Sequence, residues 1–130
     1  MSTCLVVDDS NVIRLVAGRL LASLGFAVEQ AADGTLAIAA CERAMPDLVL
    51  LDWDMPGMNG LDVLRAIRAM PGGDAPAVVF CATQGDPSQI KEAIGAGANE
   101  YVIKPFDGPI LRSKLALLGL LPGGVPAQLG

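Results

Sequence analysis

The sequence predicts an α/β domain in which five parallel strands form one doubly wound sheet between five helices. Two observations support this prediction. Short apolar runs alternate with segments whose apolar residues recur at helical spacing, from residue 3 to about residue 121. The hydrophobic content of 52% over 130 residues also suits a sheet that is covered on both faces.

The N-terminal segment predicts the first strand, the first helix and the second strand. The apolar run LVV leads into two aspartates, and apolar residues then recur at helical spacing from Ile13 to Leu24. Gly25 supplies a stop for this helix. Residues 26–31 follow as the second strand, so the alternation is established within the first quarter of the chain.

The middle of the chain repeats this alternation. Apolar positions within residues 36–44 form a second helical face, which Pro46 ends, and residues 47–52 form the third strand. The loop DMPGMNG leads to a third helix with inward positions within residues 61–67. A Pro-Gly-Gly loop at 71–73 then separates this helix from the fourth strand.

The fourth strand begins at Ala77, and a helix follows it. The dipeptide Asp86-Pro87 predicts an N-cap followed by proline at the first helical position. The apolar positions of this helix lie within residues 90–94, and the glycines at 95 and 97 end it.

The fifth strand runs to Lys104, and Asp107 is the expected cap of the last helix, whose inward side lies within residues 111–118. We therefore expect residues 1–121 to form a single domain. The Pro/Gly-rich tail at 122–130 is expected to be flexible. Right-handed crossovers between the strands favour one five-stranded doubly wound sheet.

Four of the predicted strands end on groups that suit phosphate chemistry. The first leads into Asp8 and Asp9, the third ends on Asp52, the fourth on Thr83 and the fifth on Lys104. In open α/β folds the carboxyl ends of parallel strands lie along one edge of the sheet, where binding sites form. We therefore expect these five residues to form a single pocket.

The charge of this pocket restricts its chemistry. Three carboxylates within roughly 5 Å repel one another by about 3 kcal/mol per pair at an effective dielectric near 20. Mg²⁺ relieves this repulsion best, because it binds through a few carboxylates and accepts phosphate oxygens. Asp52 is then a candidate nucleophile toward phosphorus, while the cation, Lys104 and the Thr83 hydroxyl hold the transferring oxygens.

Several segments together resemble the receiver domain of two-component response regulators, and within that family the single-domain CheY-like chemotaxis regulators. The matching segments are LVVDDS at 5–10, LLDWDMPGMNG at 50–60, Thr83 after an apolar strand, and GANEYVIKPF at 97–106. The resemblance covers residues 3 to about 121. It implies the flavodoxin-like fold with strand order 2-1-3-4-5.

The resemblance also implies roles for the acidic residues. By position, Asp52 is the residue that accepts the phosphoryl group. Asp8, Asp9 and Asp52 would hold Mg²⁺ through their side chains, and the backbone carbonyl of Asp54 would be a further ligand.

The remaining implied site residues concern the phosphoryl group and a switch. Thr83 and Lys104 correspond to residues that contact the phosphoryl oxygens. Tyr101 corresponds to an aromatic residue whose ring turns inward on activation, which couples the site to the surface of the fourth helix, fifth strand and fifth helix. The resemblance further suggests a cis peptide bond before Pro105, although only about 5–6% of such bonds are cis in general.

The composition argues against several other classes of protein. A net charge of −5 without a basic run does not suit a nucleic-acid surface. No apolar stretch approaches the roughly 20 residues of a membrane span, and the N-terminus lacks the basic region of a signal peptide. Cys4, Cys41 and Cys81 lie in apolar segments without metal-ligand spacing, so we predict reduced thiols in a cytoplasmic protein.

The receiver interpretation predicts a signalling protein that is not an enzyme beyond catalysing its own phosphorylation and dephosphorylation. The phosphoryl donor would be a sensor histidine kinase. The first candidate for output is contact with the flagellar motor switch protein. A phosphate sink, or a shuttle to a histidine phosphotransferase, is the alternative. We expect a monomer, and dimer formation on phosphorylation stays open.

Two other interpretations remain open at the level of sequence. The DWD motif resembles the Asp-x-Asp of haloacid dehalogenase-type phosphatases, with Asp52 as nucleophile and Asp54 as acid. However, that motif lies on the third strand here and no cap domain is visible. The other interpretation is an adaptor that is never phosphorylated, although all five site positions carry competent residues.

The chain also departs from the commonest chemotaxis pattern at positions that flank the path of the water that attacks the phosphorylated aspartate. Asp54 stands where such proteins often carry asparagine, and Gly85 lacks the acidic side chain that is common there. The segment from Thr83 to Tyr101 is one residue short. These differences leave the lifetime of the phosphorylated state open.

Overall fold

The computed structural model of the chain describes residues 2–83 and 86–121, and these residues form strands and helices in strict alternation. The strands are β1 (Thr3–Val7), β2 (Ala27–Ala31), β3 (Leu48–Asp52), β4 (Ala77–Thr83) and β5 (Glu100–Lys104). The helices are α1 (Asn11–Ser23), α2 (Gly34–Arg43), α3 (Gly60–Ala69), α4 (Pro87–Gly95) and α5 (Gly108–Leu117). The predicted strand boundaries agree within two residues, and the tail expected to be flexible, 122–130, lies outside the described residues.

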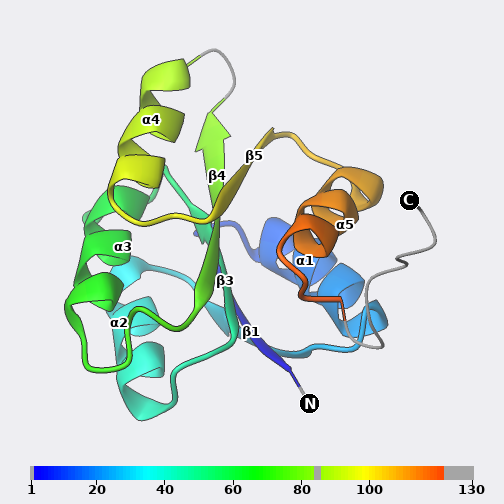
Figure 1. Ribbon diagram of the computed structural model, residues 1–130, viewed down its shortest axis with the longest axis horizontal. Coiled ribbons are helices and arrows are strands. Elements are labelled where there is room, and N and C mark those ends of the chain that lie inside the picture. The colour runs from blue at the N-terminus through cyan, green and yellow to red at the C-terminus, as the bar shows by residue number, and fades with distance from the viewer. Residues whose placement is uncertain (1, 84–85, 122–130) are drawn as a thin grey trace.

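The five strands form one parallel sheet in the order β2-β1-β3-β4-β5, which confirms the predicted doubly wound topology. Helices α2, α3 and α4 cover one face of this sheet, and α1 and α5 cover the other (Figure 1). Because all strands are parallel, their carboxyl ends lie along one edge. That edge is where the predicted site residues should meet.

The core consists of two hydrophobic clusters, one on each face of the sheet. Strand β1 contributes to both, because successive side chains of a strand point to opposite faces. Leu5 and Val7 join the cluster under α2 and α3, whereas Cys4 and Val6 join the cluster under α1 and α5. Burial on both faces explains why the central strands are continuous apolar runs in the sequence.

Four of the five helices begin at a side chain that caps the backbone. Each cap accepts a hydrogen bond from the backbone N–H three residues later, and the caps are Ser10, Asp33, Asn59 and Asp107. Asp86 precedes α4 as predicted, but its carboxylate accepts from the Ser88 hydroxyl and does not cap the helix backbone. Among residues 2–83 and 86–121, no helix is long and apolar enough to cross a membrane.

The structure differs from the sequence prediction in how α4 is rotated. Ile94 belongs to the predicted apolar face but is 46% exposed. Ala93 is buried as predicted, but the other buried residue of α4 is Gln89, which is four positions earlier and therefore shares its face of the helix. A nine-residue helix touches the sheet along one narrow stripe, so a polar residue can occupy that stripe while an isoleucine faces outward.

Candidate functional site

The carboxyl-end edge of the sheet brings the predicted site residues together. Asp8 directly follows β1, and Asp52 is the last residue of β3, the neighbouring strand. Thr83 and Lys104 end β4 and β5 and lie opposite each other in the parallel register. The topology therefore places the ends of four adjacent strands at one location, as the strand-end pattern predicted.

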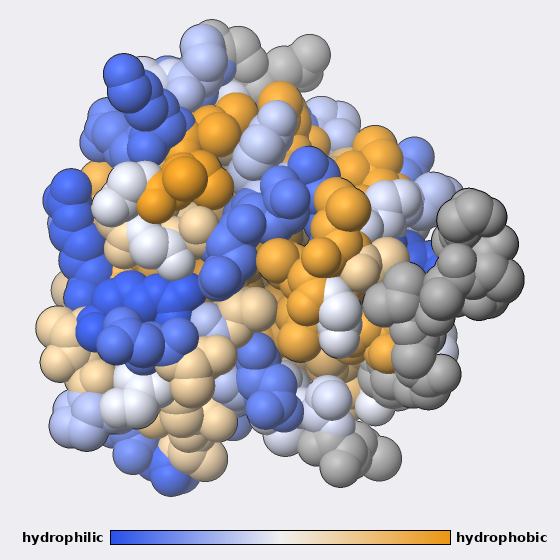
Figure 2. Space-filling model, viewed as in Figure 1, coloured by the Kyte–Doolittle hydropathy of each residue, from blue (hydrophilic) through white to orange (hydrophobic). Residues whose placement is uncertain are grey.

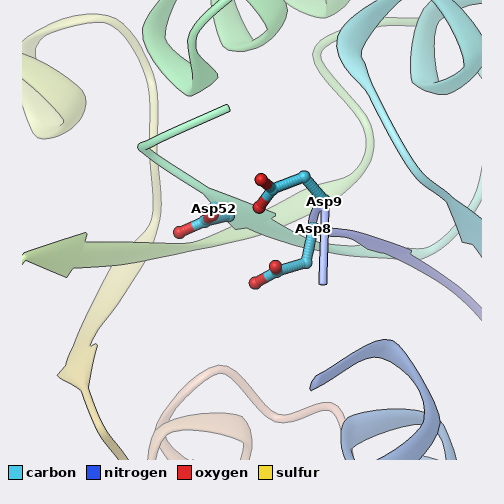
Figure 3. A group of neighbouring side chains, drawn as sticks. All are labelled: Asp8, Asp9 and Asp52. Carbon is cyan, nitrogen blue, oxygen red and sulfur yellow. The ribbon is translucent and has the colours of Figure 1, made fainter. Parts of the chain in front are cut away.

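Three carboxylates form a cluster at this edge. Oxygen atoms of Asp8, Asp9 and Asp52 all lie within 4.8 Å of one another, and the three side chains lie close together at the ends of β1 and β3 (Figure 3). Asp8 is 3% exposed and Asp52 is 2% exposed, whereas Asp9 is exposed to solvent. Buried carboxylates at this density need a compensating positive charge.

Lys104 supplies part of that charge. Its Nζ atom lies 3.0 Å from Oδ2 of Asp8 and 3.0 Å from Oδ1 of Asp52. Burial lowers the pKa of Lys104, but the hydrogen bonds to the two carboxylates and their negative charges together outweigh burial, so the net pKa is raised. Lys104 therefore stays protonated and bridges both buried acids.

The pKa of Asp52 is raised to about 6. Burial is the main cause, and the nearby charge of Asp8 adds to it, whereas the hydrogen bond and charge of Lys104 act in the opposite direction. Asp52 is thus mostly ionised at neutral pH, and burying the ionised carboxylate costs free energy.

The acidic cluster opens onto a cavity of about 340 Å³. Besides the three acids and Lys104, the residues that line it are Ser10, Ile13, Asp54 and Thr83. Asp54 and Thr83 are both exposed, so their polar groups are accessible from this cavity. Gly85, whose missing carboxylate was noted from the sequence, lies outside the described residues.

Tyr101 lies apart from this cavity and borders a groove between β5 and α5. The Nζ atom of Lys114 is 4.4 Å from the centre of the Tyr101 ring, and the same Nζ is 3.0 Å from Oε1 of Glu100. The ring thus contacts the ammonium of an α5 side chain and also packs against the hydrophobic cluster on the α2–α4 face of the sheet. The Lys104–Pro105 peptide bond is cis, as expected from the resemblance.

Two polar side chains that support the site were not predicted. The Nη1 atom of Arg14 donates a hydrogen bond to the backbone carbonyl of Asp8 at 2.6 Å. The backbone N–H of Thr83 donates to Oε1 of Gln89 at 2.7 Å. The one available signal was a polar residue four positions before Ala93, because that spacing places Gln89 on the buried face of α4.

The donor set fits Mg²⁺. The ligands are carboxylate oxygens, which hard divalent cations prefer, and they are close enough to share one ion. With all groups ionised, three acids and one ammonium leave two negative charges, which a divalent cation offsets. Asp8 and Asp9 come from one strand end and Asp52 from the next, so the fold itself holds the ligands in place.

Comparison with known proteins gives a consistent result. Residues 4–116 match the response regulator receiver domain family. The chain is 39% identical to the chemotaxis protein CheY of Pseudomonas aeruginosa over 112 residues, covering 85% of this chain and 90% of that protein. It is 38% identical to the chemotaxis protein CheY-3 of Vibrio cholerae, covering 85% and 86% respectively.

Solved structures show the same fold. The chemotaxis response regulator CheY4 of Vibrio cholerae superposes with a TM-score of 0.85 at 31% identity, covering 91% of this chain and 98% of that one. The receiver domain of a sensor histidine kinase from Pseudomonas aeruginosa, which has a magnesium ion coordinated in its active-site cleft, gives a TM-score of 0.81 at 30% identity. That alignment covers 89% of this chain and 95% of the other.

Proposed function

This chain belongs to the response regulator receiver domain family, and we propose that residues 1–121 form a single-domain response regulator that accepts a phosphoryl group on Asp52 from a sensor histidine kinase. Receiver domains of this type are signalling proteins and not hydrolases of the dehalogenase type. The observation that carries the proposal is the burial of Asp52 within 3.0 Å of Lys104 and among further carboxylates. The predicted cytoplasmic location is part of the proposal.

The chain's own residues account for the transfer. A carboxylate oxygen of Asp52 attacks phosphorus, and a P–O bond forms while the bond from phosphorus to the donor nitrogen breaks. The electron pair of the broken bond leaves with that nitrogen. Lys104 then shifts its ammonium from the carboxylate to a phosphoryl oxygen, and the Thr83 hydroxyl donates to another.

Magnesium completes the charge balance of the proposed site. Its ligands would be the carboxylates of Asp8, Asp9 and Asp52 and the backbone carbonyl of Asp54. When bound, Mg²⁺ supplies positive charge that offsets the phosphoryl oxygens as they approach the acids. Arg14 would keep the Asp8 backbone in place, because its guanidinium donates to the Asp8 carbonyl.

Intact-mass measurement tests the proposal. Incubation with acetyl phosphate and Mg²⁺ should add one labile phosphoryl group to the protein. Asp52→Asn should abolish this gain, and removal of Mg²⁺ with a chelator should abolish it in the unaltered protein. An unaltered protein that gains no mass would support the adaptor interpretation, and catalytic turnover of a small phosphomonoester would support a hydrolase.

The α4–β5–α5 face is the proposed output surface. Figure 2 shows hydrophobic areas over α4 and over α5 on this face, with a hydrophilic band between them. The exposed hydrophobic residues there include Ile94, Ile103 and Ile110, each between 41% and 46% exposed. Such a mixed surface suits a protein partner, for which the flagellar motor switch protein is the first candidate.

A pull-down with the motor switch protein tests this output, with and without beryllofluoride as the phosphoryl mimic. We expect retention only with the mimic. Loss of that retention in Ile94→Ser would locate the surface, whereas binding in neither state would contradict the motor role. Size-exclusion chromatography of the same samples tests whether the expected monomer dimerises when the mimic is bound.

A second candidate function is phosphate exchange as a sink or as a shuttle to a histidine phosphotransferase. An apolar groove of about 270 Å³ between α1 and the β5–α5 loop favours it, because this groove adjoins Lys104. Val12 and Val16 line the groove and are 69% and 61% exposed. Transfer of radiolabelled phosphate from the protein to a phosphotransferase, lost in Val16→Asp, would support this function.

A further inference from the structure

The buried amide of Gln89 connects helix α4 to the end of β4. Its Oε1 atom accepts a hydrogen bond from the backbone N–H of Thr83, with 2.7 Å between nitrogen and oxygen. Gln89 is only 7% exposed. The other buried polar or charged residues of the described chain are Asp8 and Asp52, both in the acidic site. Because a buried amide is costly unless it is hydrogen-bonded, this contact contributes to where α4 and Thr83 lie.

Within the part of the chain that the structure describes, helix α4 buries few other residues. Its buried residues are Gln89 and Ala93, whereas α3 buries five residues. An alanine side chain buries little apolar surface, so Ala93 anchors the helix weakly. The carboxylate of Asp86 at the start of α4 does not cap the helix backbone. The amide of Gln89 therefore holds the first turn of α4 to the sheet.

The other end of this contact lies at the site. Thr83 is the last residue of β4, lines the same cavity as Asp52, and lies opposite Lys104 in the sheet. A shift of the Thr83 backbone toward a phosphoryl group would change the geometry of its N–H, and hence its hydrogen bond with Gln89. Figure 1 shows α4 beside the end of β4, where such a shift would reach it.

We propose that Gln89 is a positioning residue that holds Thr83 for phosphoryl transfer and links the position of α4 to the state of the site. The inference rests on the proposed function and extends it, because it assigns the connection between site and output face to one side chain. Gln89 does not touch the acidic cluster in this role and acts through the Thr83 backbone.

Two substitutions of similar size, one without a hydrogen-bond acceptor and one with it, test this role. Gln89→Met keeps the approximate volume but removes the acceptor, whereas Gln89→Glu keeps an oxygen at the same distance along the side chain. Lys91→Met is the matched control, because Lys91 is an exposed residue of the same helix. Hydrogen exchange of residues 87–95 is measured with Mg²⁺ alone and with Mg²⁺ and beryllofluoride.

We expect beryllofluoride to change the exchange of α4 in the unaltered protein, in Lys91→Met and in Gln89→Glu, but not in Gln89→Met. The rate of phosphorylation by acetyl phosphate should fall roughly threefold to tenfold in Gln89→Met, as expected for the loss of one hydrogen bond. Its Mg²⁺ affinity, followed by Trp53 fluorescence, should stay within about twofold of the unaltered value, because no proposed metal ligand is changed. A merely structural role would not produce this difference between rate and affinity.

The outcomes distinguish this inference from the proposed function. An unaltered protein that gains no phosphoryl group contradicts the proposed function and this inference with it. If the unaltered protein is labelled but Gln89→Met keeps both its rate and its exchange response, the role of Gln89 is wrong. Should Gln89→Met fail to fold, as judged by circular dichroism, Gln89→Asn withdraws the acceptor by one methylene and must show the same losses.

Discussion

The Nζ atom of Lys104 lies 3.0 Å from Oδ1 of Asp52, although 52 residues separate the two in the chain. Asp52 is almost fully buried, while about a quarter of the Lys104 side chain is exposed. A buried carboxylate thus receives its counter-charge from a residue that also reaches the solvent. Since Lys104 is shared with Asp8, the positive charge compensates neither acid completely. The first two predictions follow from this imbalance.

Neutralising Asp52 should stabilise the metal-free protein. The pKa of Asp52 is raised to about 6, from 3.8 in the unfolded chain. At pH values between these two, the native state therefore still holds a proton that the unfolded state has released. The free energy of unfolding attributable to Asp52 therefore falls as pH rises from about 4 to about 6. Asp52→Asn removes this loss and should raise the free energy of unfolding by about 2–3 kcal/mol at pH 7, but little at pH 4.

Urea denaturation in EDTA at both pH values measures this effect. Asp62→Asn, an exposed carboxylate in the first turn of α3, is the control and should change stability by less than about 0.5 kcal/mol. An Asp52→Asn variant that is less stable than the unaltered protein at pH 7 would contradict the electrostatic account.

Removing Lys104 should have the opposite effect. Lys104→Met leaves Asp8 and Asp52 buried without their shared counter-charge, so the free energy of unfolding in EDTA at pH 7 should fall by about 2 kcal/mol. Addition of Mg²⁺ should recover part of this loss. Arg43→Met is the control, because the Arg43–Glu29 ion pair is exposed and should contribute less than about 1 kcal/mol. Equal losses in both variants would show that burial of the acids is not what matters.

Asp9 should matter for metal binding but not for folding. Because Asp9 is exposed, Asp9→Asn should leave the free energy of unfolding in EDTA unchanged or slightly higher. Its Mg²⁺ affinity should fall at least about tenfold, or about 1.4 kcal/mol. Trp53 reports the binding, since it follows Asp52 directly and packs edge-on against Phe80 with ring centres 5.4 Å apart. An unchanged Mg²⁺ affinity would remove Asp9 from the ligand set.

Gly60 should be intolerant of any side chain. A Cβ atom there would lie 2.2 Å from the backbone oxygen of Asp52, so Gly60→Ala should cost more than about 2 kcal/mol and slow phosphorylation of Asp52. Gly95→Ala provides the matched control. Its Cβ would meet nothing within 4 Å in α4, and alanine is the better helix former, so stability should rise by about 0.5–1 kcal/mol. Thermal unfolding of both variants distinguishes the two sites.

Arg68 should stabilise the side of the molecule that faces away from the site. Its guanidinium donates to the backbone carbonyls of Gly73, Pro76 and Gly97 and to the side chain of Asn99, at 2.7–3.1 Å. Arg68→Met should lower the free energy of unfolding by about 2–3 kcal/mol, because it leaves these carbonyls without a partner.

Two comparisons check the Arg68 prediction by urea denaturation. Arg68→Lys should recover little of the loss, because an ammonium cannot reproduce the planar set of donors. Arg65→Met, at an exposed position of the same helix, should change stability by less than about 0.5 kcal/mol. Full recovery by lysine would show that charge alone, without geometry, explains the contribution of Arg68.

The alternation of strands and helices, the cap at Asp107 and the gathering of Asp8, Asp52, Thr83 and Lys104 at one edge could be predicted from the sequence. These features depend on local patterns and on one topological fact, that parallel strands share an edge for their carboxyl ends. A residue's place at the end of a strand can be read from its immediate neighbours.

Which side chains meet depends on the tertiary fold. The sharing of Lys104 by two acids, the hydrogen bond from Thr83 to Gln89 and the outward position of Ile94 depend on side-chain rotamers and on the rotation of α4 about its axis. Helical periodicity indicates which residues share a face of a helix. When the apolar stripe is short, it does not indicate which face packs against the sheet. The face that packs against the sheet is set by contacts between segments distant in the chain, and no local sequence pattern describes those contacts.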